Sequence, residues 1–377
     1  MMDHKEIFAH TKLRRDCTGL GYDNIKTIVQ ETVEEYSKID DDNTNPGLVI
    51  LKKQPDFEEY QKTVRGIVAL QNVKNVLHSS DAYYKGYKNC RGLIGATAAI
   101  AWSPVTDKTY ELITYRESNR WGTKRSVDDE STKTMDKTCT STFDNYDYLN
   151  NHNRLVPNSL CPVLYGIRGD VHEDVIRAYS MIESEPVESW IIFETNQGTD
   201  DHLQKITIGG IQPYQSVIVE GSVSRNPSTI EGGHVIFTIN DATGTIDCAA
   251  YEPTKQFRTV IRELVVGDIV EVYGGVRDNP LTVNIEKIDI KHLTKIVEKV
   301  ENPLCPQCGK HMKSKGTQQG YKCKHCGTVE KKPILREKQR AIQTGFYEAP
   351  VCVRRHLSKP LKRVHRVIAT AGAPRPL

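Results

Sequence analysis

Long apolar segments and an organised set of cysteines are both missing from this 377-residue sequence. Its longest nearly apolar run, Leu93–Trp102, is far too short to cross a bilayer as a helix, and the sequence shows no signal peptide. Six of the ten cysteines are scattered without the spacing of a disulfide framework. These absences exclude a membrane protein and a disulfide-stapled secreted domain, so we expect a soluble cytoplasmic protein with no membrane partner.

Positive charge is scarce in the first three quarters of the chain and concentrated near its C-terminus. Residues 1–290 carry 31 Lys+Arg against 43 Asp+Glu, whereas residues 291–377 carry 20 against 5, a charge of −12 followed by +15. Lysine and arginine release condensed counterions when they meet phosphates, so the basic end is the expected anchor for a polyanion. A chain of this length should form two to four domains, each with its own core.

Five segments with β-branched or alternating apolar residues, bounded by Gly, Asn, Asp or Pro, predict strands in the second half of the chain. They are Ser216–Ser224, His234–Asn240, Thr245–Tyr251, Ile269–Val276 and Leu281–Ile290. One helix, Thr254–Leu264, is predicted between the third and fourth strands. This is the element order of the OB-fold, a partly open barrel that binds oligonucleotides or oligosaccharides. Many barrels with the same order bind neither, so the order alone does not fix the function.

Two Cys-x-x-Cys pairs follow the predicted barrel, with fourteen residues between them. Four thiolates at this spacing can converge tetrahedrally on one Zn²⁺, and they leave no open coordination position, so the site is expected to be structural. The alternative, two disulfides, would require a secreted protein. The predicted ligands are Cys305, Cys308, Cys323 and Cys326.

Lysines crowd this short cysteine-rich module, and Tyr321 among them offers a surface on which a base could stack. The pattern is typical of a surface that faces phosphates, although a solvated lysine face has the same composition. The lysines expected on nucleic acid are Lys313, Lys315, Lys322 and Lys324, with Lys310 beside them.

The first 88 residues predict a small α/β unit with one clear strand, Leu48–Leu51. The helices expected around it are Asn24–Ile39, Asp56–Val68 and Val73–Tyr87. A single strand has no sheet partner, so we expect this unit to be only part of a domain.

Residues 89–205 predict a second α/β unit. Its expected strands are Lys108–Arg116, Pro162–Ile167 and Ser189–Glu194. The second strand runs into Arg168-Gly169 just before a helix, Glu173–Ile182. Free backbone N–H groups at a helix N-terminus, together with a guanidinium, can bind an anion. Strand–Gly–helix turns are also common without any ligand, so both interpretations stay open.

Dense polar residues follow the strand Ser189–Glu194, where ligands of α/β sheets usually gather. Asp200 could hold Mg²⁺ or act as a base, and His202 could transfer a proton near neutral pH. The alternative is a capped turn followed by an exposed histidine.

Four long segments of the chain resemble the archaeal tRNA-Ile 2-agmatinylcytidine synthetase family. They are Arg91–Ala96, Cys161–Gly169, Thr195–His202 and Gly345–Leu361. The resemblance extends over nearly the whole chain and implies a multidomain α+β protein. Its expected parts are a partial kinase-like α/β unit (1–88), a ferredoxin-like domain (89–205), an OB-fold β-barrel (206–297), a zinc ribbon (298–335) and a basic C-terminal tail (336–377).

The resemblance implies ATP-dependent ligation of agmatine to C2 of the wobble cytidine in the CAU anticodon of tRNA-Ile. ATP first activates the C2 oxygen, and the agmatine amine then displaces it, so the expected cofactors are ATP, Mg²⁺ and a structural Zn²⁺. We expect Arg168, Asp200 and His202 to take part in catalysis. The residues expected at the nucleotide are Gly166, Gly169, Asn196 and Thr199. Those expected on tRNA, besides the ribbon lysines, are Arg354, Arg355 and Lys359.

The chain departs from the family at its start. Members open with an acidic Gly-Ile-Asp-Asp-Thr-Asp-Ser motif and a Cys-Thr-Thr segment, and this chain has neither. Only the last part of the kinase-like domain matches, with Asp41 or Asp42 as its remaining acids, so we expect this chain alone to bind tRNA and to modify cytidine poorly.

The alternative function is a non-enzymatic nucleic-acid-binding protein built from an OB-fold and a zinc ribbon. The unit at residues 89–205 separates the two hypotheses, because a plain binding protein has no need of it.

Overall fold

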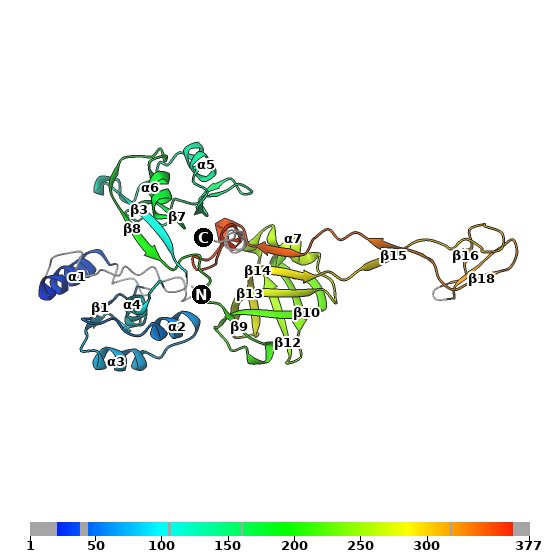
Figure 1. Cartoon of the computed structure of the whole chain (residues 1–377), viewed down its shortest axis with the longest axis horizontal. Coiled ribbons are helices and arrows are strands. Elements are labelled where there is room, and N and C mark those ends of the chain that lie inside the picture. Colours follow the sequence, from blue (N-terminus) through cyan, green and yellow to red (C-terminus); the bar gives the residue numbers. More distant parts are fainter. Residues whose placement is uncertain (1–20, 38–43, 105–106, 160, 317–318, 365–377) are drawn as a thin grey trace, which may run out of the picture.

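The computed structural model describes residues 21–37, 44–104, 107–159, 161–316 and 319–364. Figure 1 shows three bodies, formed by α1–α4, by the sheet with α5 and α6, and by the barrel, around the C-terminal end of the described chain. A long arm leads from the barrel to a small terminal module. Within the described residues, no helix is both long enough and apolar enough to cross a membrane.

The first domain packs four helices around two antiparallel strands. These elements are α1 (Tyr22–Tyr36), β1 (Gly47–Ile50), α2 (Phe57–Arg65), α3 (Leu70–Ser79), β2 (Tyr83–Gly86) and α4 (Gly92–Ala101). The prediction of a helix over Val73–Tyr87 and of a single strand is therefore wrong. The helix ends at Ser79, Asp81 adopts a positive φ of 49°, and the aromatic residues that follow suit a strand better than a helix.

A close contact between backbones holds α4 on this small sheet. A Cβ atom on Gly92 would lie 2.2 Å from the carbonyl oxygen of Asn45, and one on Gly47 would lie 2.2 Å from the carbonyl carbon of Gly92. Only glycine permits this approach. The contact places α4 against β1, with Leu93 buried beside Val49.

The second domain is ferredoxin-like. Its elements are β3 (Thr109–Arg116), α5 (Asp129–Thr138), β4 (Thr142–Phe143), β7 (Val163–Gly169), α6 (His172–Tyr179) and β8 (Val187–Thr195). They follow the order βαββαβ, and the antiparallel sheet has the order β4-β7-β3-β8. Asp128 caps α5 by accepting a hydrogen bond from the Ser131 backbone N–H at 2.6 Å, which fixes where that helix begins. A hairpin of β5 (Tyr146–Asp147) and β6 (His152–Asn153) follows β4.

The third domain is the predicted OB-fold. Its elements are β10 (Ser216–Thr229), β11 (Val235–Asn240), β12 (Thr245–Ala250), α7 (Phe257–Arg262), β13 (Ile269–Arg277) and β14 (Thr282–His292). The strands pair in the order β11-β12-β14-β13-β10, and β10 pairs again with β11, so the barrel closes. Alternate apolar residues such as Val219, Phe237 and Val272 fill its interior. The prediction of five strands and one helix is confirmed.

The terminal module and the arm that carries it are an insertion that follows the last barrel strand, β14. The arm consists of β15 (Ile296–Glu301) and β19 (Ile334–Lys338), which pair antiparallel. The module at its end holds β16 (Lys313–Ser314), β17 (Tyr321–Lys322) and β18 (Val329–Glu330). After the arm returns, β20 (Gly345–Glu348) pairs with Lys287–Ile290 of β14. The chain therefore leaves the barrel from β14 and comes back to the same strand.

Candidate functional site

The four predicted metal ligands converge at the end of the arm. All four Sγ atoms lie within 4.8 Å of one another, and Cys305 Sγ is 3.3 Å from Cys326 Sγ. In each knuckle a glycine N–H donates to the carbonyl of the first cysteine, from Gly309 to Cys305 and from Gly327 to Cys323. Thiolates about 2.3 Å from one Zn²⁺ have this kind of separation, so the donor set fits zinc. No other group of three or more such ligands occurs among the described residues.

The ribbon lysines lie on the surface, as expected. Lys313, Lys315, Lys322 and Lys324 are exposed, and none forms an ion pair with another described residue. Tyr321 differs from the expectation: it is only 8% exposed and packs with Met312 and the zinc cysteines. Its ring supports the module from within, so it is not a free surface for base stacking.

Arg168 does not lie at the helix N-terminus where an anion site was predicted. Its Nε atom donates to Glu111 Oε1 at 2.9 Å, and its Nη2 atom lies 3.1 Å from His356 Nδ1. A Cβ atom on the next residue, Gly169, would lie 2.7 Å from Val175 of α6. Because neighbours in a strand point to opposite faces, Arg168 points away from α6. The Arg168 charge is the main cause that lowers the pKa of His356, to about 4, so this imidazole is neutral at pH 7.

The two glycines expected at the nucleotide are strand residues of β7. Gly166 pairs with Ile113 and donates its N–H to the Leu155 carbonyl at 2.9 Å, and Gly169 is the last residue of the strand. Neither has a positive φ. Gly169 allows close packing against α6, whereas a Cβ atom at Gly166 would meet no atom nearer than 3.5 Å.

Asp200 is partly exposed and His202 is buried, and both face charged partners from β14. Asp200 Oδ2 accepts from Lys287 Nζ at 2.5 Å, and Asp200 Oδ1 accepts from the Lys359 backbone N–H at 2.7 Å. His202 is 2% exposed, and its Nε2 atom lies 3.6 Å from Glu286 Oε2. Asp200 thus faces Lys287, and His202 faces Glu286. Asp41 and Asp42 lie outside the described residues.

Asn196 and Thr199 stabilise the loop that carries Asp200. Asn196 Nδ2 donates to the Tyr60 hydroxyl at 2.8 Å, and that hydroxyl donates to Asp201 Oδ2 at 2.8 Å. Thr199 Oγ1 donates to the Asn196 carbonyl at 2.6 Å. Both side chains are buried, and the first of them joins the loop to α2 of the first domain.

Three basic residues expected on tRNA form ion pairs within the chain. Arg354 pairs with Asp144 and Glu348, and Arg355 Nη1 lies 2.9 Å from Glu286 Oε1. Lys359 Nζ donates to Asp107 Oδ2 at 2.7 Å. Except for Glu348, six residues before Arg354, these partners come from distant parts of the chain, so local spacing could not reveal them.

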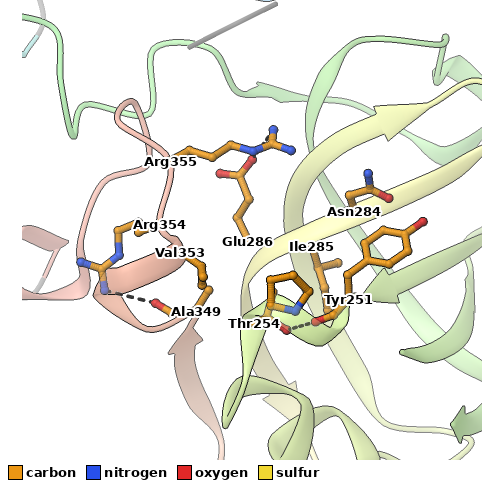
Figure 2. A pocket seen from close by; sticks show the side chains of 10 residues that line it. Tyr251, Thr254, Asn284, Ile285, Glu286, Ala349, Val353, Arg354 and Arg355 are labelled. Carbon is orange, nitrogen blue, oxygen red and sulfur yellow. Dashed lines mark hydrogen bonds and ion pairs between the residues drawn. The ribbon is translucent and has the colours of Figure 1, made fainter. Parts of the chain in front are cut away.

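A cavity of about 160 Å³ lies between the barrel and the tail. Figure 2 shows Glu286 and Arg355 pointing toward one another beside it. Burial raises the pKa of Glu286, but Arg355, His202 and Lys287 together lower it to about 2, so the carboxylate is charged. Ligand pockets usually measure roughly 300 Å³ or more, so this cavity is too small for a nucleotide. Its lining is Tyr251, Pro253, Thr254, Asn284, Ile285, Glu286, Ala349, Val353, Arg354 and Arg355.

Sequence reasoning missed the partners that position these side chains. Glu111, Glu286 and Lys287 sit within strands, where a single charged residue gives no spacing signal. Lys287 is 1% exposed, between Glu286 and the buried Ile288. A lysine buried to this extent needs a partner of opposite charge, but the mixed sequence of this strand does not mark the position as buried.

Three family models match the chain. The TiaS FLD domain matches residues 90–202, an OB-fold nucleic acid binding domain matches 217–291, and the TiaS C-terminal zinc ribbon domain matches 302–342. The tRNA-Ile 2-agmatinylcytidine synthetase TiaS of Methanocaldococcus jannaschii is 46% identical over 352 residues, which are 91% of this chain and 82% of that protein. The part of the relative left unmatched is therefore small, in contrast to the expected loss of most of the first domain.

Solved structures give the same result. The crystal structure of a TiaS complex with tRNA-Ile and ATP is 40% identical, with a TM-score of 0.82 over 91% of this chain and 82% of that one. A TiaS complex with tRNA-Ile, AMPCPP and agmatine is 38% identical, with a TM-score of 0.78 over the same shares. Sequence and fold agree along nearly the whole length, and the chain belongs to the tRNA-Ile 2-agmatinylcytidine synthetase (TiaS) family.

Proposed function

We propose that this chain is an ATP-dependent tRNA-modifying ligase that joins agmatine to C2 of the wobble cytidine in the CAU anticodon of tRNA-Ile. The observation that carries the proposal is the match over 91% of the chain to a relative solved with tRNA-Ile and ATP, at a TM-score of 0.82. A second relative was solved with agmatine and an ATP analogue. A tRNA substrate also favours a cytoplasmic location.

The exposed lysines of the ribbon support a role in holding tRNA. Lys313, Lys315, Lys322 and Lys324 meet no acid among the residues that the structure describes, and the arm carries them far from the three domains (Figure 1). Phosphates and helix shape can be recognised without base contacts. The proposed division of labour places tRNA binding on the ribbon and chemistry among the domains.

Among the predicted catalytic residues, Arg168 remains our candidate for contact with a phosphoryl group. Its side chain is one quarter exposed and lies on the sheet face away from α6. We propose that Asp200 and His202 position the loop instead of reacting, and that Gly166, Gly169, Asn196 and Thr199 shape the wall beside the nucleotide. Mg²⁺ would arrive on the ATP phosphates, which share its coordination sphere with waters and one or two carboxylates in such reactions.

The direct test incubates the chain with ATP, Mg²⁺, agmatine and a tRNA-Ile transcript bearing CAU, followed by mass spectrometry of the nucleosides. The proposal expects the mass of agmatine-modified cytidine, and its absence when the wobble base is changed to uridine. The matched protein control is Arg168→Lys, which keeps the charge but loses the bidentate fork. Tight tRNA binding with no agmatine-dependent ATP consumption would instead identify a non-enzymatic nucleic-acid-binding protein.

A further inference from the structure

The segment Pro350–Arg363 lies where all three domains meet. It follows β20, and Figure 1 shows this end of the chain between the ferredoxin-like domain and the barrel. Its backbone binds the loop after β8, because Gly198 N–H donates to the His356 carbonyl at 2.7 Å and Asp200 N–H donates to the Leu357 carbonyl at 2.9 Å. We call Pro350–Arg363 the C-terminal segment.

Arg363 fixes this segment to the ferredoxin-like domain. Its guanidinium is 5% exposed and donates to Asp107 Oδ1 at 2.8 Å, to Asp170 Oδ1 at 2.5 Å and to the Gly198 carbonyl. Asp107 lies between the first domain and β3, and it also accepts from Lys359. Burial raises the pKa of Asp107, but Arg363 and Lys359 lower it below its ordinary value, so the carboxylate stays charged in this cluster.

The barrel is attached to the same segment by other charges. Arg355 pairs with Glu286 of β14 at 2.9 Å, and Lys287 Nζ donates both to the Lys359 carbonyl at 2.9 Å and to Asp200. Arg354 joins Asp144 of the ferredoxin-like domain to Glu348 of β20. Each of these contacts links two parts of the molecule through one side chain.

The first domain contributes an apolar contact. Leu357 is buried with Tyr60, Val64, Ala98 and Ala101, which belong to α2 and α4. The C-terminal segment thus touches every domain, and its cations meet acids that the earlier part of the chain supplies. This arrangement accounts for part of the opposite charges, −12 and +15, of the two parts of the sequence.

We propose that the C-terminal segment sets the relative position of the three domains, with Arg363 and Arg354 as positioning residues for the ligation. The consequence for the reaction rests on the function proposed above. Domains joined by short linkers are expected to move unless their interface is extensive. A reaction that joins ATP, tRNA and an amine depends on positioning, and a misplacement of about 1 Å can reduce the rate about 100-fold.

The test compares Arg363→Ala and Arg363→Lys with Lys362→Ala in the full chain. Lys362 is a neighbouring residue with the same charge and a looser contact, 3.5 Å from Asp136. The measurements are small-angle X-ray scattering of the free protein, tRNA affinity at several salt concentrations, and kcat with agmatine. Thermal unfolding shows whether each variant still folds.

We expect Arg363→Ala to enlarge the radius of gyration and to lower kcat by about 10- to 100-fold. Affinity for tRNA and its salt dependence should stay unchanged, because Arg363 does not face solvent. Arg363→Lys should recover part of the compactness and rate, and Lys362→Ala should match the unchanged chain. If Arg363→Ala no longer folds, Arg363→Lys becomes the deciding variant. It should fold and lose part of the compactness.

Two results would overturn the proposal. If Arg363→Ala lowered the salt slope of tRNA binding by about one, Arg363 would be a phosphate contact. If scattering and kcat both matched the unchanged chain, the segment would not set the domain positions. Should the unchanged chain fail to modify tRNA, the scattering and salt measurements still decide this proposal, while only the proposed function would fall.

Discussion

Buried ion pairs with distant partners are the main residue-level feature of this protein. Arg116 and Glu185 are 1% and 4% exposed, with Nε 2.6 Å from Oε1. Arg340 holds Asp268 through two hydrogen bonds at the root of the arm. Removing one partner of such a pair leaves an uncompensated charge away from water, so each pair is sensitive to single substitutions.

We predict that Arg116→Met destabilises the ferredoxin-like domain by roughly 3–5 kcal/mol near neutral pH. Burial raises the pKa of Glu185, and hydrogen bonds from Arg116 and Ser126 lower it below its ordinary value. A lowered carboxyl pKa gives stability that is present above the unfolded pKa and is lost as the pH falls. Without Arg116 the carboxyl protonates more easily, so the difference between variant and unchanged chain should shrink toward about pH 4.

Urea unfolding near neutral pH and near the ordinary carboxyl pKa measures this difference. Trp121, whose Nε1 donates to the Arg116 carbonyl at 3.0 Å, is a fluorescent reporter in the same domain. The control is Lys62→Met, which removes a cation from an exposed pair and should cost less than about 1 kcal/mol. Equal losses in the two variants would contradict the prediction.

The sequence predicted individual residues well only where their partners are close in the chain. The four cysteines are two short pairs, so their spacing alone identifies the zinc site. Asp200 and Lys287 are 87 residues apart, and Arg168 and His356 are 188 apart. The chemistry of Asp200 and Arg168 therefore looked catalytic in isolation, and only the tertiary contacts show what each charge faces.

At the scale of elements, the barrel was predictable and the first domain was not. The barrel strands carry either alternating apolar residues or short β-branched runs between turn signals, and both patterns predict strands. In the first domain β1 and β2 are four residues each, and thirty-two residues separate them. Such short strands carry little periodic signal, so the sequence predicts the end of a helix where β2 lies.

The zinc ribbon should need its metal ion in order to fold. We predict that Cys305→Ser abolishes zinc binding and unfolds the terminal module, because the metal contributes about 10–16 kcal/mol to such a fold. The barrel should keep its own thermal transition, since its core lies apart from the ribbon cluster.

Zinc content by mass spectrometry and limited proteolysis would measure both effects. Cys90→Ser, at a partly exposed cysteine of the first domain, is the matched control and should retain one zinc per chain. Chelation of the unchanged chain should reproduce the cleavage pattern of Cys305→Ser. A protease-resistant ribbon without zinc would show that the module folds by its apolar contacts alone.

At the scale of the whole molecule, positive charge is divided between two uses. The C-terminal segment pairs its cations with acids of the ferredoxin-like domain and the barrel and with Asp107, whereas the ribbon presents its lysines to solvent. Net charge alone predicted one basic anchor from residue 291 onward, because it cannot separate internal ion pairs from free surface charge.

We predict that replacing Lys313, Lys315, Lys322 and Lys324 by alanine weakens tRNA binding and makes it less sensitive to salt. Each lost phosphate contact should reduce the slope of log K against log salt by roughly 0.7–0.9. Affinity measured between about 50 and 200 mM salt gives the slope. The control replaces Lys52 and Lys53, which are exposed on the first domain, and should leave the slope unchanged. If log K falls with log salt at the same slope in the lysine variant and in the unchanged chain, the tRNA contact lies elsewhere.

The arm leaves the barrel and returns to it through two paired strands, with Ile296 opposite Lys338. Both ends of the excursion therefore lie side by side, and the barrel strands β14 and β20 pair with each other without any residue from the module. A unit attached in this way can be exchanged by recombination without disturbing the fold that receives it. Evolution, or a protein engineer, could therefore replace the module and its exposed lysines while the barrel and the two other domains are kept.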